Sequence, residues 1–404
     1  MSMNRTILIA TPLYLPDVGG PATFAKTLEA ELPKWGFDVR LVKFGEVKHL
    51  PKGIRHLAYF YKLFTAALGA DTILAFDPVS VGLPAYIVAR LFGKKFIVRV
   101  AGDYAWEQEQ GKRQNAKVKN TSQKFLTPEE FQTKKFGFVT EVRRWVERHV
   151  AKSSEKIIVP SQYLKKIVEM WGVTPEKISV IYNAFASDNS IPLRLLSDEL
   201  REDAVELSEQ VLGTREELRK KFGWNKKIVI SAGRDVPWKG FSLLREVMKE
   251  IPEAGLFVAH TLQKKELLER IKAADLFVLN TGYEGLSHQL LEVMSIGTPI
   301  ITTNVGGNPE LIENGKEGIL IQYNDREALK RSIMELLLIP EYSAKLARQA
   351  KEKVKQFTVE KMVRELIALL SWKRSGPPAR QVKEKVAKFS VKRMINALIA
   401  TLKS

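Results

Sequence analysis

Short apolar runs alternate with longer amphipathic stretches along most of the chain. The runs are rich in Val, Ile and Leu, which is typical of strands buried on both faces. Each run is followed by a stretch long enough for a helix, and this alternation predicts parallel sheets with helices on both sides. In the N-terminal half, the expected strands are Ile7–Ala10, Val39–Val42, Thr72–Phe76, Phe96–Val100 and Ile157–Val159.

The same alternation starts again after Trp224, so the sequence predicts two doubly wound α/β domains. A charged, glutamate-rich stretch separates the two series and suits a helical connector on the surface. We therefore expect an N-terminal domain over residues 1–186, a connector over 187–224 and a C-terminal domain over 225–340. In the second series, the expected strands are Ile228–Ser231, Leu256–Ala259, Leu276–Leu279, Ile300–Thr303 and Ile319–Ile321.

The end of the chain contains an internal repeat. Residues Ala350–Leu370 and Val382–Leu402 match at 11 of 21 positions at an offset of 32 residues. The helix-breaking segment Ser375–Pro378 lies between the two copies. The repeat therefore predicts an amphipathic helix, then a turn, and then a near copy of that helix within residues 372–404. From Trp372 to Ser404 there are nine basic residues and one acidic residue. The second copy suits an anionic membrane surface, or it is a duplicated packing helix with a solvated polar face.

Composition narrows the function classes. The chain has 404 residues, no cysteine and a formal net charge of +18, so disulfides and cysteine–metal sites are excluded and anionic partners are favoured. Neither a nucleic-acid-binding module nor a basic–aromatic sheet pattern is present, so we expect no nucleic-acid partner. The apolar run Ile7–Ala10 is interrupted by Thr11-Pro12 and is too short for a signal peptide, which favours a cytoplasmic location, with a peripheral membrane position if the basic C-terminal helix binds lipid.

The segment after the expected strand Leu276–Leu279 carries the strongest chemical signal. Here Gly285 permits close backbone approach, Ser287 is placed to cap a helix, and Gly306-Gly307 forms a second strand-to-helix turn. Two helix N-termini at the carboxyl ends of parallel strands favour a phosphate-bearing ligand. Carboxylates at Glu284 and Glu292 suit sugar and ribose hydroxyls, although either is also an ordinary surface charge when taken alone.

Three further loops follow expected strands. Arg234 and Lys239 follow the strand Ile228–Ser231 and suit the clamping of a diphosphate, or form a basic surface turn. Gly19-Gly20, after the first strand, would let backbone amides approach a phosphate, but by itself this is a generic turn. Asp103 would orient a sugar hydroxyl or be a buried structural aspartate, and Trp106 would stack on a sugar ring.

The sequence offers no metal site. The five histidines show no ligand spacing, and no Asp-x-Asp pair is present to hold a divalent ion under a diphosphate. We therefore expect no metal or other cofactor, with the phosphate charge neutralised by Arg234, Lys239 and the helix N-termini.

Together these segments, in this order, resemble retaining glycosyltransferases of the GT-B architecture, specifically glycosyltransferase family 4. The matching motifs are GRDVPWKG, the Glu284-x7-Glu292 pair and VGGNPELI. The resemblance implies two facing Rossmann-like domains with an interdomain cleft, with Ser161 and Asn183 at further family positions. It also implies that residues 341–371 cross back onto the N-terminal domain.

The resemblance further implies site roles. Arg234 and Lys239 would hold the donor diphosphate, Glu284 the sugar and Glu292 the ribose, while the turn Gly285, Leu286 and Ser287 would complete the donor site. Gly19 and Gly20 would approach the phosphates from the other domain, and Asp103 would lie beside the donor sugar. Glu284 and Asp103 are the catalytic candidates.

The implied activity is transfer of a sugar, with retention, from a UDP-, GDP- or ADP-sugar to a hydroxyl of a glycan, lipid-linked or small-molecule acceptor. This is a hexosyltransferase-type reaction of the kind used in polysaccharide biosynthesis. The chain departs from the family pattern between Lys239 and Asp275, where one βα unit is missing. That departure motivates the alternative of a catalytically silent protein that binds a nucleotide sugar or polysaccharide.

Overall fold

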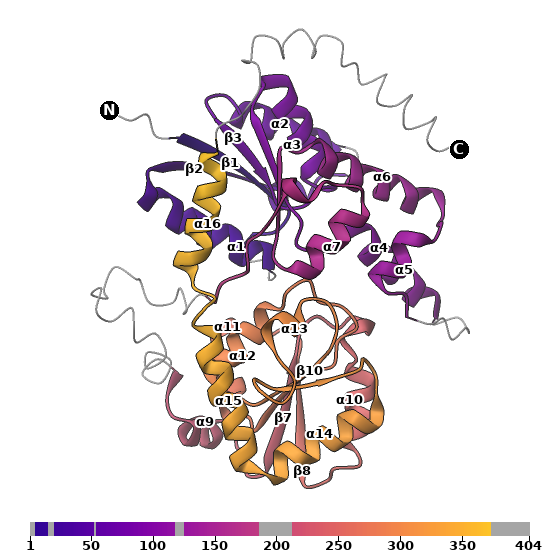
Figure 1. Ribbon diagram of the computed structural model, residues 1–404, viewed down its shortest axis with the longest axis vertical. Coiled ribbons are helices and arrows are strands. Elements are labelled where there is room, and N and C mark those ends of the chain that lie inside the picture. The colour runs from indigo at the N-terminus through magenta and orange to yellow at the C-terminus, as the bar shows by residue number, and fades with distance from the viewer. Residues whose placement is uncertain (1–4, 15–19, 52–53, 118–124, 186–211, 373–404) are drawn as a thin grey trace. The chain divides into compact units, whose positions relative to one another are not determined.

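The computed structural model describes residues 5–14, 20–51, 54–117, 125–185 and 212–372 (Figure 1). The chain divides into two compact units. Unit 1 comprises residues 1–182 and 360–404, and unit 2 comprises residues 183–359. Each unit contains one parallel sheet with helices packed on it, so the predicted α/β class with two doubly wound domains is confirmed.

Unit 1 is built on a six-stranded sheet in the order β2-β1-β3-β4-β5-β6. The pairs are all parallel, and the chain reverses its direction of travel across the sheet between β1 and β3, which are neighbours. Such a reversal is where open α/β sheets form ligand sites. The strands are β1 (Arg5–Thr11), β2 (Phe37–Lys43), β3 (Thr72–Ala75), β4 (Lys95–Arg99), β5 (Lys156–Val159) and β6 (Ile178–Val180).

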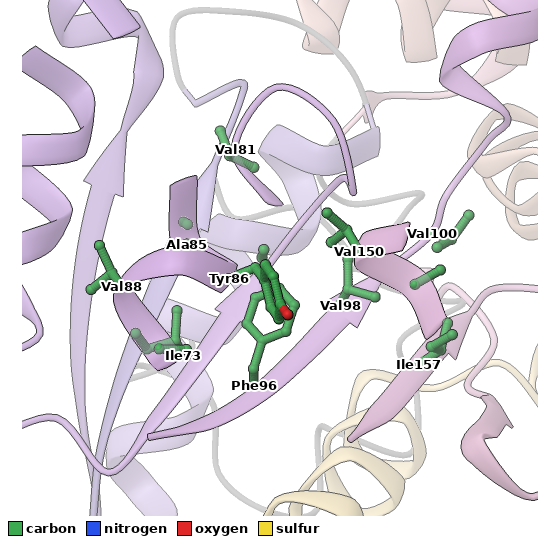
Figure 2. Close-up of a cluster of buried hydrophobic side chains, with 14 of the residues drawn as sticks. Ile73, Val81, Ala85, Tyr86, Val88, Phe96, Val98, Val100, Val150 and Ile157 are labelled. Carbon is green, nitrogen blue, oxygen red and sulfur yellow. The ribbon is translucent and has the colours of Figure 1, made fainter. Parts of the chain in front are cut away.

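The helices of unit 1 bury their apolar sides against this sheet. Figure 2 shows one such contact, in which Tyr86 of a helix lies over Phe96 of β4 and Val150 of another helix lies near Val98. Alternate residues of each strand face this cluster, as the period of a strand requires. The helices are α1 (Gly20–Glu31), α2 (Ile54–Ala66), α3 (Gly82–Phe92), α4 (Tyr104–Lys117), α5 (Pro128–Thr133), α6 (Phe138–Ser153), α7 (Gln162–Met170) and α16 (Val359–Ser371).

Unit 2 contains a five-stranded parallel sheet in the order β11-β10-β9-β7-β8. Here the direction reverses between β7 and β9, since β8 lies on one side of β7 and β9 on the other. The strands are β7 (Lys227–Ala232), β8 (Ala254–Ala259), β9 (Leu276–Leu279), β10 (Ile300–Thr303) and β11 (Ile319–Ile321).

The helices of unit 2 cover both faces of this sheet. One face forms a core in which Val229, Val278 and Ile301 cluster with apolar side chains of three helices, among them Leu244, Ile333 and Leu346. The helices are α9 (Arg215–Lys221), α10 (Phe241–Met248), α11 (Lys264–Ala273), α12 (His288–Ile296), α13 (Asn308–Leu311), α14 (Arg326–Leu338) and α15 (Pro340–Val354).

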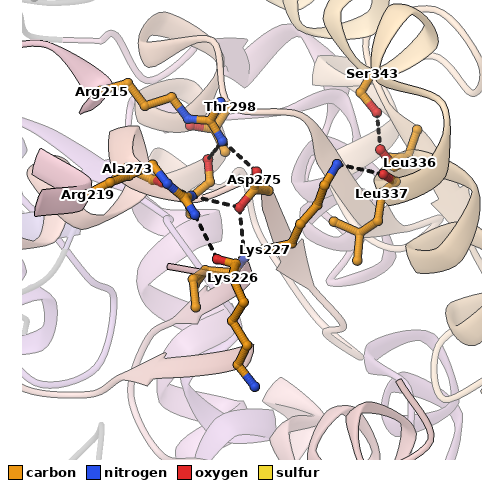
Figure 3. Close-up of polar contacts among 12 residues, drawn as sticks. Arg215, Arg219, Lys226, Lys227, Ala273, Asp275, Thr298, Leu336, Leu337 and Ser343 are labelled. Atoms are coloured by element: carbon orange, nitrogen blue, oxygen red, sulfur yellow. Dashed lines mark hydrogen bonds and ion pairs between the residues drawn. The ribbon is translucent and has the colours of Figure 1, made fainter. Parts of the chain in front are cut away.

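Asp275 stabilises the edge of the unit 2 sheet at which the strands begin (Figure 3). Its carboxylate accepts from Arg215 at 2.6 Å, from Arg219 at 2.9 Å and from the backbone N–H of Ile228 at 2.7 Å. One carboxylate thus connects helix α9 to the starts of β7 and β9. Because the side chain is only 16% exposed, these bonds are weakly screened by solvent.

All ten expected strands are present, and β6 is the strand that the sequence pattern missed. Its three residues, Ile178–Val180, are too few to show a period. The prediction of one helix over Ala350–Leu370 was wrong, because α15 ends at Val354 and α16 begins at Val359. The carbonyl of Phe357 accepts from the N–H of Phe185 at 3.0 Å, so this stretch is paired with another part of the chain instead of continuing a helix.

Two predicted segments lie wholly or partly outside the described residues. Most of the connector, 187–211, is among them, and α9 lies in the described remainder. The basic helix proposed for residues 372–404 falls there as well, apart from Trp372.

Candidate functional site

The loops that follow β7, β9 and β10 lie at one edge of the unit 2 sheet, because these three parallel strands are neighbours. We call this edge, where the strands end, the carboxyl edge. The loop after β7 carries Arg234 and Lys239, and the loop after β9 carries Glu284. The sheet reverses its order between β7 and β9, so these residues flank the position where such sheets bind ligands.

Lys239 and Glu284 form an ion pair at this edge. Their side chains are only 13% and 16% exposed, so the pair is largely shielded from water. Lys239 is held at the end of a short 3-10 turn, Pro237–Lys239, and the preceding carbonyl of Trp238 accepts from the N–H of Gly282 at 2.7 Å. The two loops are therefore joined by backbone as well as by charge. Arg234, in contrast, is exposed.

The loop after β10 contacts Glu284 through its glycines. The N–H of Gly307 donates to the carbonyl of Glu284 at 3.0 Å. Gly306 has a φ of 59°, and a Cβ at this position would overlap the backbone of Glu284. A side chain at Gly306 is thus opposed both by the left-handed backbone and by the close approach of Glu284.

The start of helix α12 is built as the sequence predicts. Ser287 caps it by accepting from the N–H of Leu290 at 3.3 Å, and the left-handed Gly297 ends it. Leu286 is buried, and its carbonyl accepts from the side-chain amide of Asn183 at 3.2 Å. Gly285, Leu286 and Ser287 therefore form the turn that leads from Glu284 into the helix N-terminus.

Glu292 lies in the second turn of α12 and forms an ion pair with Lys264 of α11. The Glu292 side chain is 16% exposed, whereas that of Lys264 is 50% exposed. Because the Lys264 side chain is long and half-exposed, a ligand can replace it as the partner of Glu292.

Some residues that organise this edge were not singled out by the sequence. Asn280 and Thr281 directly follow β9 and are buried. Asn280 donates to the carbonyl of Gly240 at 3.3 Å, and the carbonyl of Thr281 accepts from the hydroxyl of Thr303 at 2.6 Å. These bonds connect the loop after β9 to the loop after β7 and to the end of β10. The sequence feature that could have identified them is two polar residues, Asn and Thr, directly after an apolar strand.

In unit 1, Asp103 follows β4 and is fully buried. Its carboxylate accepts from the backbone N–H of Trp106 at 2.8 Å and from the amide of Gln132 at 2.7 Å. The first of these bonds caps the start of α4. The expectation that Trp106 stacks on a sugar was wrong, because its ring is fully buried and its Nε1 donates to the carbonyl of Leu126 at 2.8 Å.

A second buried carboxylate lies beside Asp103. Glu147 of α6 accepts from the backbone N–H of Tyr104 at 2.9 Å. Burial raises the pKa of Glu147 well above its usual range, and the charge of Asp103 raises it further. Burial also raises the pKa of Asp103. The start of α4 is therefore held by two carboxyl groups whose pKa values are raised by burial.

The remaining predicted positions lie near helix starts. Gly19 lies outside the described residues, and Gly20 is the first residue of α1. Ser161 caps α7 by accepting from the N–H of Leu164 at 3.1 Å. Within the described ranges, no cluster of three His, Asp or Glu side chains is arranged to hold a metal ion. None of the helices described is both long and apolar enough to cross a bilayer.

Comparison with known proteins identifies two family matches. Residues 18–188 match the family described as Glycosyltransferase Family 4, and residues 253–353 match Glycosyl transferases group 1. Glu284 and Glu292 lie within the second match, whereas Arg234 and Lys239 precede it. Most of both units is therefore covered.

Individual relatives are distant. The chain is 26% identical over 220 residues to α-maltose-1-phosphate synthase of Mycolicibacterium smegmatis, a match covering 48% of this chain and 56% of that protein. The chain spans about half the length of the curated relatives that it matches first, at 56%, 56% and 44%.

Solved structures share the fold over nearly the whole chain. Sucrose-phosphate synthase of Thermosynechococcus elongatus superposes with a TM-score of 0.71 at 16% identity, covering 91% of this chain and 98% of that one. HepE of Anabaena in complex with UDP-glucose superposes with a TM-score of 0.62 at 17% identity, covering 91% and 99%. At these identities the likeness concerns the fold.

Proposed function

The chain belongs to the glycosyltransferases of the GT-B fold, and on that basis we propose that it transfers a sugar, with retention, from a nucleotide-diphosphate sugar to an acceptor hydroxyl. One observation carries the proposal. The loops after the neighbouring strands β7 and β9 bring a lysine, an arginine, a carboxylate and the N-terminus of α12 to the switch point of the unit 2 sheet.

The proposed roles follow from the charge of each group. Arg234 and Lys239 hold the donor diphosphate, since a guanidinium fork and an ammonium suit phosphate oxygens. Glu284 accepts hydrogen bonds from the sugar, and Glu292 accepts them from the ribose. Arg234 is exposed and can therefore bind a phosphate. Lys264 is partly exposed, so it can give up its ion pair with Glu292 when the ribose binds.

In the proposed reaction, the bond between the anomeric carbon and the β-phosphate oxygen breaks as the acceptor oxygen bonds to that carbon. The acceptor proton passes to the departing phosphate, so no further base is needed. Positive charge at the diphosphate stabilises the negative charge that develops there. We propose that no metal is required, because Arg234, Lys239 and the α12 N-terminus supply this charge.

Residues of unit 1 contribute less directly. That the backbone at Gly19 and Gly20 would approach the donor phosphates stays a prediction from the sequence. Asp103 is proposed to act by fixing the start of α4, because both of its carboxylate oxygens accept hydrogen bonds inside the protein. Replacement of Asp103 by Asn would then alter the acceptor KM more than donor binding.

The nucleotide base of the donor and the identity of the acceptor can be tested directly. HepE binds UDP-glucose, so a UDP-sugar is the first donor to try. For the acceptor we propose a glycan or lipid-linked hydroxyl used in polysaccharide synthesis, in the cytoplasm or at the inner face of its membrane. Hexosyl transfer is the expected subclass.

The test is a panel of UDP-, GDP- and ADP-sugars, with thermal stabilisation and nucleotide release measured on the full chain. One donor should raise the Tm and be slowly hydrolysed, and both effects should be lost in Glu284→Ala and Arg234→Ala. Arg331→Ala is the matched control, because this arginine is exposed on α14 and is not part of the loops after β7, β9 and β10. Stabilisation without turnover in the presence of acceptors would instead indicate a silent binding protein.

A further inference from the structure

Helix α2 carries large apolar side chains on its outer side. Leu57 is 72% exposed, Tyr61 is 68% exposed and Leu68, just beyond the helix end, is 57% exposed. Leu91, at the end of α3, is also exposed, and the rings of Phe64 and Phe92 lie 4.8 Å apart, which places the two helix ends side by side. We call this set the α2 patch: Ile54, Leu57, Tyr61, Phe64, Leu68 and Leu91.

The patch follows the helix period. Its α2 members recur at alternating steps of three and four residues, so their Cα positions fall within about 80° of one another around the helix axis. Tyr59 and Leu63, which are fully buried, mark the core-facing side. At 100° per residue, the patch lies roughly opposite that side. This helix is therefore apolar on the face toward the core and again on the face away from it.

The surroundings of the patch are basic. From Val47 to Ala70, and again from Pro78 to Gly102, the sequence contains no acidic residue. In the same two segments, the described basic side chains that are at least partly exposed include Lys48, Arg55 and Lys62 near α2 and Arg90 and Lys94 at the end of α3. The nearby carboxylate of Glu46 is bound to Lys62 at 2.6 Å.

We propose that the α2 patch docks on an anionic lipid bilayer. An apolar helix face with basic residues around it suits the boundary between acyl chains and anionic headgroups. A second copy of this chain would bring the same positive charge against it. The C-terminal segment, with nine basic residues and one acidic from Trp372 on, would do the same. Charge therefore favours an anionic lipid surface over a second copy of the chain or the C-terminal segment. The proposal is independent of sugar transfer.

The experiment is cosedimentation of the full chain with vesicles of phosphatidylcholine alone or mixed with phosphatidylglycerol. We expect binding to the anionic vesicles that weakens as salt is raised. The double variant Leu57→Asp/Tyr61→Asp should bind at least about tenfold more weakly, because it places charge where acyl chains should lie. Leu338→Asp is the matched control: that leucine is 71% exposed on unit 2 and its replacement should leave binding unchanged.

Several outcomes would overturn the proposal. One is equal binding by the double variant and the wild-type chain. Another is loss of all binding on deletion of residues 373–404 while the double variant still binds, which would assign the membrane contact to the tail. A third is a dimer in light scattering that the double variant abolishes without any vesicle binding, which would assign the patch to a second copy. Unchanged thermal melting of the double variant would confirm that it is folded.

Discussion

Lys239 and Glu284 lie 45 positions apart in the chain and form a shielded ion pair at the carboxyl edge of the unit 2 sheet. The pair joins the loop after β7 to the loop after β9, across the point where the strand order reverses. A phosphate that approaches Lys239 must therefore compete with the carboxylate of Glu284.

This competition gives the first prediction. Lys239→Met should weaken binding of a free nucleoside diphosphate by at least about tenfold, because a charge-assisted phosphate contact is lost. Glu284→Gln should bind the free diphosphate at least as tightly as the wild type, while losing sugar transfer. Titration calorimetry measures both affinities. Lys221→Met is the control, since Lys221 pairs with Glu269 near the end of α9, away from this edge; a similar loss there would contradict the assignment.

The second prediction concerns Gly306. Gly306→Ala should destabilise unit 2 by about 2 to 4 kcal/mol, because its Cβ meets the Glu284 backbone and its φ is left-handed. Gly223→Ala is the matched control, with a φ of 66° but nothing near an added Cβ. It should cost only the backbone strain, about 1 kcal/mol. Urea unfolding of both variants measures the difference, and equal losses would show that the contact with Glu284 is unimportant.

The third prediction tests the Asp275 contacts. Asp275→Ala leaves Arg215, Arg219 and the N–H of Ile228 without their shared acceptor, and should destabilise the unit by about 3 kcal/mol. Hydrogen exchange should quicken first in peptides from α9 and β7. In Glu352→Ala, which breaks a solvent-exposed pair with Lys355, exchange should hardly change. Slow exchange retained in the Asp275 variant would argue against this role.

The fourth prediction is a pH dependence. The folded-state pKa of Glu147 lies well above its ordinary value of 4.5, so the folded state retains a proton that the unfolded chain has lost. The stability of unit 1 should therefore fall as pH rises from about 4.5 toward the folded pKa. Asp103 contributes in the same direction.

Glu147→Gln removes this cost while keeping an oxygen to accept from Tyr104. Its stability relative to wild type should increase as the pH is raised above about 5, measured as the urea midpoint at each pH. Glu352→Gln, an exposed glutamate, should follow the wild-type slope. A Glu147→Gln slope equal to that of wild type would mean that this carboxyl group is ionised in the folded protein.

The sequence by itself determined the strands and much of the local chemistry. Apolar runs such as Leu276–Leu279 and Ile300–Thr303 were placed to the residue, because a strand buried on both faces needs a continuous apolar segment. The cap at Ser287 was also predicted, since it depends on one local backbone conformation.

The tertiary structure decided which loops meet. Strand order is a property of pairing between distant segments, so only the fold shows that β9 lies between β7 and β10. From that order come the pairing of Lys239 with Glu284, the approach of Gly306 to Glu284, and the hydrogen bonds of Asn280 and Thr281. Burial, likewise, depends on what packs around a side chain: Trp106 and Asp103 follow a strand like the donor-site residues, yet both are enclosed within unit 1.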